Sequence, residues 1–127
     1  MEANELTIII DRPVEEVFLY TIDPANTPTW VASIAEEKTS EWPVKLGTIY
    51  ENQNNSGIWS KFKVTGFEAN KLFAIENFNG EFGVEYVFSR EAGEKTKLVY
   101  KELVKVGELE KPLTQEEFEK LKIAIES

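Results

Sequence analysis

The residues best suited to chemistry in this chain are a few polar side chains that stand among apolar neighbours in its second half. Glu102 interrupts an apolar row, where a carboxylate is costly unless it is hydrogen-bonded, hydrated or functional. As a general acid or base it would act beside Tyr86 or Tyr100, whose hydroxyl could donate a hydrogen bond to a carbonyl. A structural role for Glu102 fits the sequence equally well, and Ser60 and Asn77 are better explained as hydrated residues near strand ends.

Histidine and cysteine are both absent from the sequence. Their absence excludes nucleophilic catalysis by Ser-His or Cys-His pairs, histidine metal sites, disulfides and zinc-thiolate centres. Carboxylates remain as conceivable metal ligands, but neighbouring acidic residues fan apart on a helix or strand. We therefore expect no metal and no cofactor, and we expect solvated faces from three acidic pairs: Glu15-Glu16, Glu36-Glu37 and Glu116-Glu117.

The composition indicates one globular domain spanning residues 1–127. Twenty-three acidic and fourteen basic residues give a net charge of −9, which disfavours nucleic acid as a partner. No apolar run approaches the roughly 20 residues that cross a bilayer, so we expect no membrane insertion. No secretory signal is visible at the N-terminus, and a cytoplasmic location is the expectation that follows.

Three predicted hairpins determine which side chains of the second half share a face. Asn79-Gly80 predicts a two-residue type I′ turn, and a four-residue loop 68–71 and a three-residue loop 92–94 predict the hairpins on either side. With these registers, Ile75 lies opposite Val84, and the aromatic and aliphatic residues of four strands fall on one side of the sheet. The resulting apolar face is of the kind that holds a hydrophobic ligand.

The remaining patterns predict elements on either side of this sheet. A β-branched run at 6–10 predicts a strand, and apolar residues at helical spacing predict helices at 13–22 and, more briefly, at 26–34. Strands are expected at 36–41 and through 49–50, with a turn at 52–57. At the C-terminus, Thr114 and Glu117 form a capping box and Leu113 with Phe118 a hydrophobic staple, so a helix of about 13 residues should cover the apolar face.

The order of these elements resembles the START-like, or SRPBCC, superfamily, whose helix-grip fold includes birch-pollen-allergen proteins and polyketide cyclase/dehydrase-type domains. The resemblance spans nearly the whole chain and rests on loose motifs in a specific order: Ile8-Ile9-Ile10-Asp11-Arg12-Pro13-Val14-Glu15-Glu16-Val17-Phe18, Asp23-Pro24, Pro28-Thr29-Trp30, Leu46-Gly47-Thr48, Val64-Thr65-Gly66-Phe67 and Thr96-Lys97-Leu98. It implies an α+β fold with two short helices after the first strand, then a curved antiparallel sheet of about seven strands around a C-terminal helix. Family members commonly have a longer last helix, so we expect a cavity here that is small or open at one end.

The resemblance also implies a cavity between the sheet and the last helix that binds a hydrophobic or aromatic small molecule. The family has no common catalytic set, so a polyketide cyclase/dehydratase-like enzyme using Glu102, and a protein-interaction module of the chaperone-activator type, remain as alternatives. The oligomeric state is left open. Twelve residues are the expected ligand contacts: Tyr50, Phe62, Phe73, Ile75, Asn77, Val84, Tyr86, Phe88, Tyr100, Glu102, Phe118 and Leu121.

Overall fold

The computed structural model describes all 127 residues as one antiparallel sheet with helices on one of its faces. The elements in chain order are β1 (Glu2–Ile10), α1 (Val14–Ile22), a 3₁₀ turn η1 (Thr27–Thr29), β2 (Ile34–Thr39), β3 (Ile49–Asn54), β4 (Trp59–Glu68), β5 (Leu72–Asn77), β6 (Phe82–Glu91), β7 (Lys95–Val104) and α2 (Gln115–Glu126). This arrangement confirms the predicted α+β helix-grip fold.

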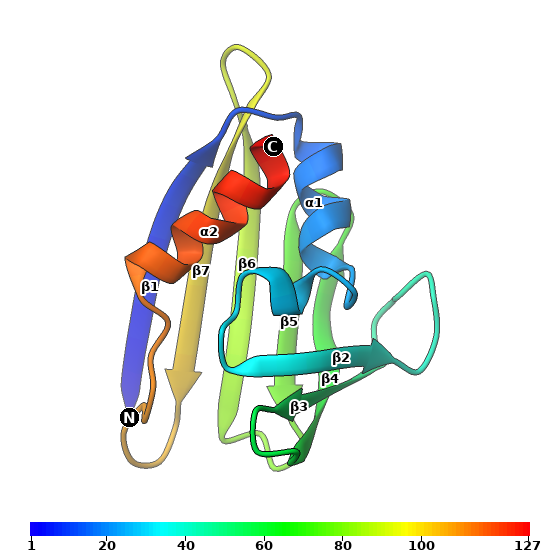
Figure 1. The fold of residues 1–127 in the computed structure, drawn as a ribbon, viewed down its shortest axis with the longest axis vertical. Coiled ribbons are helices and arrows are strands. Elements are labelled where there is room, and N and C mark those ends of the chain that lie inside the picture. The colour runs from blue at the N-terminus through cyan, green and yellow to red at the C-terminus, as the bar shows by residue number, and fades with distance from the viewer.

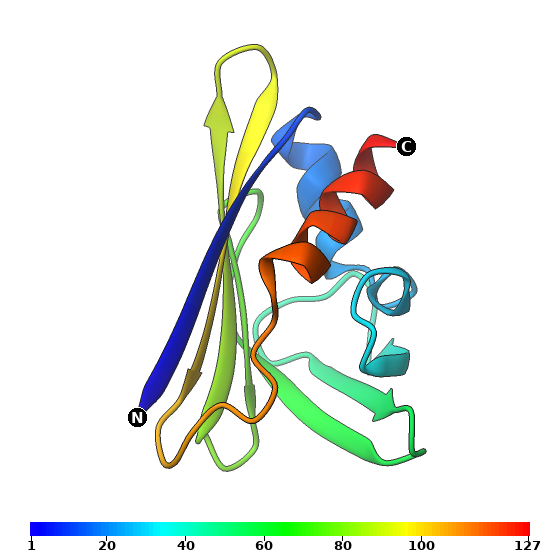
Figure 2. The same cartoon turned by 60° about the vertical axis from the view of Figure 1, so that its left-hand side comes forward.

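The seven strands follow the order β1-β7-β6-β5-β4-β3-β2, so every neighbouring pair except β1-β7 is also adjacent in sequence. The sheet curls, and α1, α2 and η1 all lie on its concave side (Figures 1 and 2). β2 and β3 bend away from the plane of the other strands and run beneath η1 in Figure 2. No helix is long and apolar enough to cross a bilayer.

The predicted registers of the central strands are confirmed. Phe73 pairs with Tyr86 and Ile75 with Val84 across β5 and β6, and Tyr86 pairs with Tyr100 across β6 and β7. The loop at 92–94 also has the predicted length of three residues, since β6 ends at Glu91 and β7 begins at Lys95. Because successive strand residues alternate between faces, these pairs place the aromatic residues together on the concave side.

The prediction of a two-residue type I′ turn at Asn79-Gly80 is wrong. That turn needs positive φ at both residues, but only Gly80 has one, at 72°. The loop spans 78–81 and is closed by hydrogen bonds from the Gly80 amide to the Asn77 carbonyl and from the Glu81 amide to the Asn79 side chain. The register survives because a four-residue loop and a two-residue loop centred on the same point pair the same residues.

The loop between β4 and β5 is also shorter than predicted. It spans 69–71, with Asn70 at a φ of 65°, and the pairing shifts by one residue between Val64 and Gly66. This β-bulge compensates for the shorter loop, so the predicted pair of Val64 with Ile75 is kept.

Only one of the two predicted N-terminal helices is a full α-helix. α1 begins after Pro13, carries two acidic residues in its first turn, where they favour the helix dipole, and buries Val17 and Phe18. The expected second helix is reduced to the 3₁₀ turn η1, because β2 starts at Ile34, two residues earlier than predicted, and takes the chain back into the sheet. β3 likewise continues to Asn54, so the turn expected at 52–57 falls after that residue.

α2 is the predicted cover of the sheet. The Thr114 side chain accepts a hydrogen bond from the Glu117 amide, as the capping signal predicted, and the helix is 12 residues long. Its residues Phe118, Leu121 and Ile125 are buried in one core with residues of α1 and the sheet. The helix crosses the concave face near β1 and β7, which leaves the lower part of that face uncovered by α2 (Figure 1).

Candidate functional site: a cavity on the concave face

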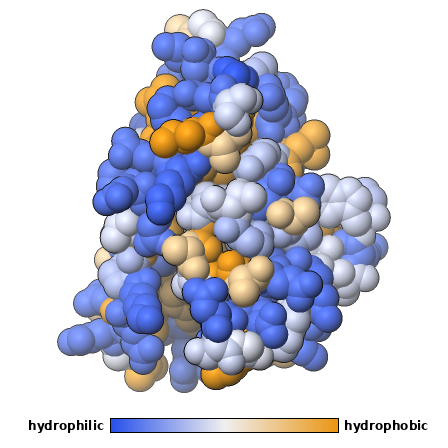
Figure 3. Space-filling view, viewed as in Figure 1, coloured by the Kyte–Doolittle hydropathy of each residue, from blue (hydrophilic) through white to orange (hydrophobic).

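A cavity of about 610 Å³ lies in the part of the concave face that α2 does not cover. Its floor is formed by β3 to β7, and its sides by the η1–β2 segment and by the connection from β7 to α2. Figure 3 shows apolar surface in a hollow below α2, between that connection and β2. The exposed residues Ala32, Asn55 and Pro112 line the mouth, so the cavity is open at one end.

The floor of the cavity is largely aromatic. The rings of Tyr50 and Phe73 lie 5.4 Å apart, those of Phe73 and Tyr86 6.0 Å, and those of Tyr86 and Tyr100 5.3 Å between centroids. Each neighbouring pair comes from strands that are one or two positions apart in the sheet, so the continuous sheet holds these rings in place. Aromatic rings at such separations attract one another and present π faces and edges to anything between them.

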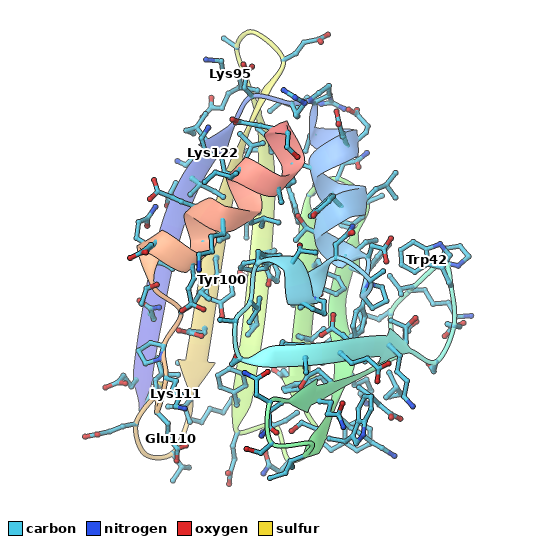
Figure 4. All side chains as sticks on the ribbon, in the orientation of Figure 1. Trp42, Lys95, Tyr100, Glu110, Lys111 and Lys122 are labelled. Carbon is cyan, nitrogen blue, oxygen red and sulfur yellow. The ribbon has the colours of Figure 1, made fainter.

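Glu102 is buried at 4% exposure beside the cavity, and both of its side-chain oxygens accept hydrogen bonds. Its Oε1 accepts from the Asn4 side chain (2.8 Å) and the Leu113 amide (2.7 Å), and its Oε2 accepts from the Tyr100 hydroxyl (2.7 Å). Asn4 also donates to the Leu113 carbonyl (2.9 Å). The carboxylate therefore ties β1, β7 and the connection to α2 together beneath Tyr100, which points into the space between α2 and β2 (Figure 4).

A second carboxylate, Glu37, lines the opposite side of the cavity. Thr27 of η1 donates to its Oε1 (2.6 Å), and Asn52 of β3 donates to its Oε2 over a longer 3.4 Å. Glu37 forms no ion pair with any basic residue of the chain. Burial raises the pKa of Glu37 from 4.5 to about 7, because water is displaced from the charged form and two neutral donors replace it only in part.

Tyr86 presents a free hydroxyl to the cavity. This hydroxyl has no hydrogen-bond partner within the chain, and no side-chain oxygen is both buried and unpaired, so it faces open space. Burial, followed by the nearby Glu37 and Glu102 carboxylates, raises the pKa of Tyr86 well above its usual value. Tyr86 is thus a neutral donor or acceptor between two acidic groups. The hydroxyl of Tyr50, in contrast, donates to the Ile22 carbonyl (2.6 Å) and holds the end of α1.

The structure brings eight of the twelve predicted contact residues to this cavity. They are Tyr50, Phe62, Phe73, Ile75, Val84, Tyr86, Tyr100 and Glu102. Seven of them are the inward-facing residues of β4 to β7 that the hairpin registers placed on one face, and the eighth, Tyr50, belongs to β3, which those registers did not reach.

The other four predicted residues do not line the cavity. Phe88 packs under α1, with its ring 5.0 Å from that of Phe18, and Phe118 and Leu121 are fully buried where α2 meets the sheet. The Asn77 side chain accepts a hydrogen bond from the Phe82 amide and stabilises the hairpin between β5 and β6. Phe88 and Asn77 thus belong to the sheet but are engaged by α1 and by the hairpin, whereas Phe118 and Leu121 belong to α2 and pack in the core.

Sequence reasoning missed Glu37, and the expectation that Glu36-Glu37 forms a solvated face is wrong for this residue. A β-bulge between Ile34 and Glu36 reverses the alternation of β2, so Ile34 and Glu37 share the inner face and Glu36 remains exposed. Glu117 is a second exception, because it lies half-buried at the cavity. A predicted β2–β3 register could have revealed Glu37. It pairs Glu37 with Asn52, which lies two residues after Tyr50 and therefore on the same face of β3.

The polar groups of the cavity suit recognition more than covalent chemistry. Hydrogen-bond acceptors at Glu37 and a free hydroxyl at Tyr86 stand against an aromatic floor, and Lys111 at the mouth is the only basic residue of the lining. No group of three or more acidic, histidine or cysteine side chains gathers in a way that could hold a metal ion. The arrangement can orient a largely apolar molecule through a few polar contacts.

Several solved structures share this fold at low sequence identity. DR_A0006 from Deinococcus radiodurans is 14% identical with a TM-score of 0.70, over 99% of this chain and 95% of that protein. XoxI from Bacillus cereus is 12% identical with a TM-score of 0.71, over 99% and 94%. Ara h 8.0201, a Bet v 1-like protein, is 16% identical with a TM-score of 0.62, over 98% and 97%.

Comparison by sequence adds no closer relative, since no protein-family model and no curated protein matches the chain. At these identities the solved structures establish the fold and leave the ligand open. The structural similarity extends over 98–99% of this chain. The protein therefore has the helix-grip fold of the START-like, or SRPBCC, superfamily.

Proposed function

We propose that the protein binds a hydrophobic or aromatic small molecule in the cavity of the concave face, without chemical conversion, and that residues 1–127 form a single START-like domain. The observation that carries the proposal is the 610 Å³ cavity with an aromatic floor and one free hydroxyl. A protein of this size normally fills its interior with side chains, and voids larger than a water molecule are few. A space of these dimensions fits the usual range for small-molecule sites.

The alternative of a cyclase or dehydratase that uses Glu102 has less support. Both oxygens of that carboxylate accept hydrogen bonds from protein donors. One of these donors is the Tyr100 hydroxyl, the other group that the enzyme hypothesis would use. A general acid or base needs a free position within hydrogen-bond reach of the substrate. The alternative of a protein-interaction module rests on the acidic exterior alone.

The binding proposal can be tested with the neutral, polarity-sensitive dye N-phenyl-1-naphthylamine. We expect saturable dye fluorescence with the wild-type protein, and native mass spectrometry of freshly purified protein should show a co-purified small molecule. Tyr86→Trp should weaken dye binding by filling part of the cavity. Ser89→Trp, on the exposed side of the same strand, is the matched control and should bind as the wild type does.

Both variants need circular dichroism spectra like those of the wild type before their affinities are compared. Dye binding that is equal in the two folded variants would move the site away from the concave face. Absence of both dye binding and a co-purified molecule would refute the binding proposal.

A further inference from the structure

We propose that the cavity selects a ligand with a protonated amine, whose ammonium group pairs with the carboxylate of Glu37 while its aromatic or aliphatic body lies on the floor of Tyr86 and Phe73. This inference rests on the proposed binding function and adds the charge class of the ligand. It excludes fatty acids and other organic anions as preferred occupants.

The first support is the charge distribution of the lining. Three carboxylic side chains line the cavity, at Glu37, Glu102 and Glu117, against one basic side chain, Lys111. Lys111 is exposed at the mouth and pairs with none of the acidic groups (Figure 4). An organic anion in this space would face like charges at short range, whereas a cation would be attracted.

The second support is that Glu37 differs from the other two carboxylic groups. Glu102 accepts three short hydrogen bonds from protein donors, and Glu117 lies at the start of α2, beside its capping residue Thr114. Glu37 has only the Thr27 hydroxyl at short range and the Asn52 amide at 3.4 Å. A carboxylate oxygen accepts up to two hydrogen bonds, so Glu37 retains capacity for a donor supplied by a ligand.

The third support is the aromatic floor. Ammonium groups are attracted to the faces of tyrosine and phenylalanine rings, most strongly where water is excluded. The rings of Tyr50, Phe73, Tyr86 and Tyr100 form a continuous series within the same cavity as Glu37. The net charge of −9 further favours the approach of a cation from solution.

Pairing with an ammonium group requires Glu37 to be ionised, so binding should depend on pH. In the free protein this carboxyl is half-protonated near pH 7, and an amine bound at lower pH must displace a proton. Other titratable or charged groups face the same space or stand next to it, and their charges act on the same equilibrium. They are Asp23 at the end of α1, Tyr50 of β3, Tyr86 of β6, Tyr100 and Glu102 of β7, Lys111 of the connection and Glu117 of α2.

The test compares three probes of one shape by isothermal titration calorimetry: 2-naphthylmethylamine, 2-naphthylmethanol and 2-naphthoate. At pH 8 we expect the amine to bind at least about tenfold more tightly than the alcohol, and the carboxylate to bind most weakly. The affinity for the amine should fall on going from pH 8 to pH 6. At pH 6 the heat of binding should vary with the ionisation enthalpy of the buffer, which reports the released proton.

Glu37→Gln should bring the amine and the alcohol within about threefold of each other and remove the pH dependence between 6 and 8. Glu36→Gln removes the same charge from the exposed face of β2 and should leave the tenfold preference intact. Equal or tighter binding of the alcohol or the carboxylate by the wild type would overturn the amine assignment while the binding proposal stands. If none of the three probes and no neutral dye binds, both proposals fail together.

Discussion

The backbone amide of Leu113 donates a 2.7 Å hydrogen bond to the buried carboxylate of Glu102, and this contact joins the connection before α2 to β7. The Asn4 side chain bridges the same two residues from β1. One wall of the cavity is the segment containing Leu113, so the geometry of the opening depends on this small polar cluster. From the sequence alone, Glu102 could have either a catalytic or a structural role. In the structure its hydrogen bonds support one wall of the cavity.

Glu102→Gln should destabilise the protein by about 1–3 kcal/mol, because an amide group cannot accept hydrogen bonds on both of its atoms and leaves a buried donor unpaired. Urea unfolding followed by circular dichroism measures the effect. Glu91→Gln, an exposed change near the end of β6, is the control and should alter stability by less than about 0.5 kcal/mol. Equal stability of the two variants would show that the cluster does not support the fold.

Phe118→Ala should cost about 3–5 kcal/mol, since this ring is fully buried between Trp30 and Tyr100, at centroid distances of 6.2 and 5.6 Å. Ile123→Ala on the exposed side of α2, where the residue is 66% exposed, is the matched helix control. It should change the unfolding free energy by less than about 0.5 kcal/mol. A loss below that value for Phe118→Ala would mean that α2 does not cover the sheet.

The central sheet could be predicted because its signals are local and agree with one another. Ile75 and Val84 belong to neighbouring strands joined by a short loop, and the loop at 92–94 extends the alignment to Tyr100. The detailed type of the turn at Gly80 was not needed for that result. The part of the floor that β4 to β7 form therefore followed from the hairpin registers, including seven of the lining residues.

The side walls could not be predicted in the same way, because they depend on contacts between segments far apart in the chain. Glu37 faces inward only through a bulge next to Ile34, and bulges leave no simple trace in an alternating pattern. Its partner Thr27 belongs to a 3₁₀ turn that was expected to be a longer helix. The hydrogen bond from the Leu113 amide to Glu102 likewise joins two residues that no periodicity in the sequence relates.

Tyr50→Phe should destabilise the protein by about 1–3 kcal/mol, because it leaves the carbonyl of Ile22 without its 2.6 Å hydrogen bond inside the core. Tyr20→Phe removes a hydroxyl of the same kind, which contacts Thr29 at 3.2 Å on the surface. Thermal or urea unfolding of the pair isolates the buried bond, and we expect less than about 0.5 kcal/mol for Tyr20→Phe. Similar losses from both changes would contradict the role of Tyr50 in holding α1.

The stability of the ligand-free protein should fall as pH rises from about 4.5 to about 7 through the contribution of Glu37. Burial raises its pKa from 4.5 to about 7 in the folded state, so over this range the folded protein holds a proton that the unfolded chain has lost. The stabilising contribution of the protonated form is complete below pH 4.5 and is lost as pH passes the folded value. Glu37→Gln, which mimics the neutral form, should gain stability relative to the wild type at pH 8 and lose that advantage at pH 5. Urea midpoints of the wild type and Glu37→Gln at both pH values test this, with Glu36→Gln as the exposed control. A stability difference between wild type and Glu37→Gln that is the same at pH 5 and pH 8 would show that folding does not raise the pKa of Glu37.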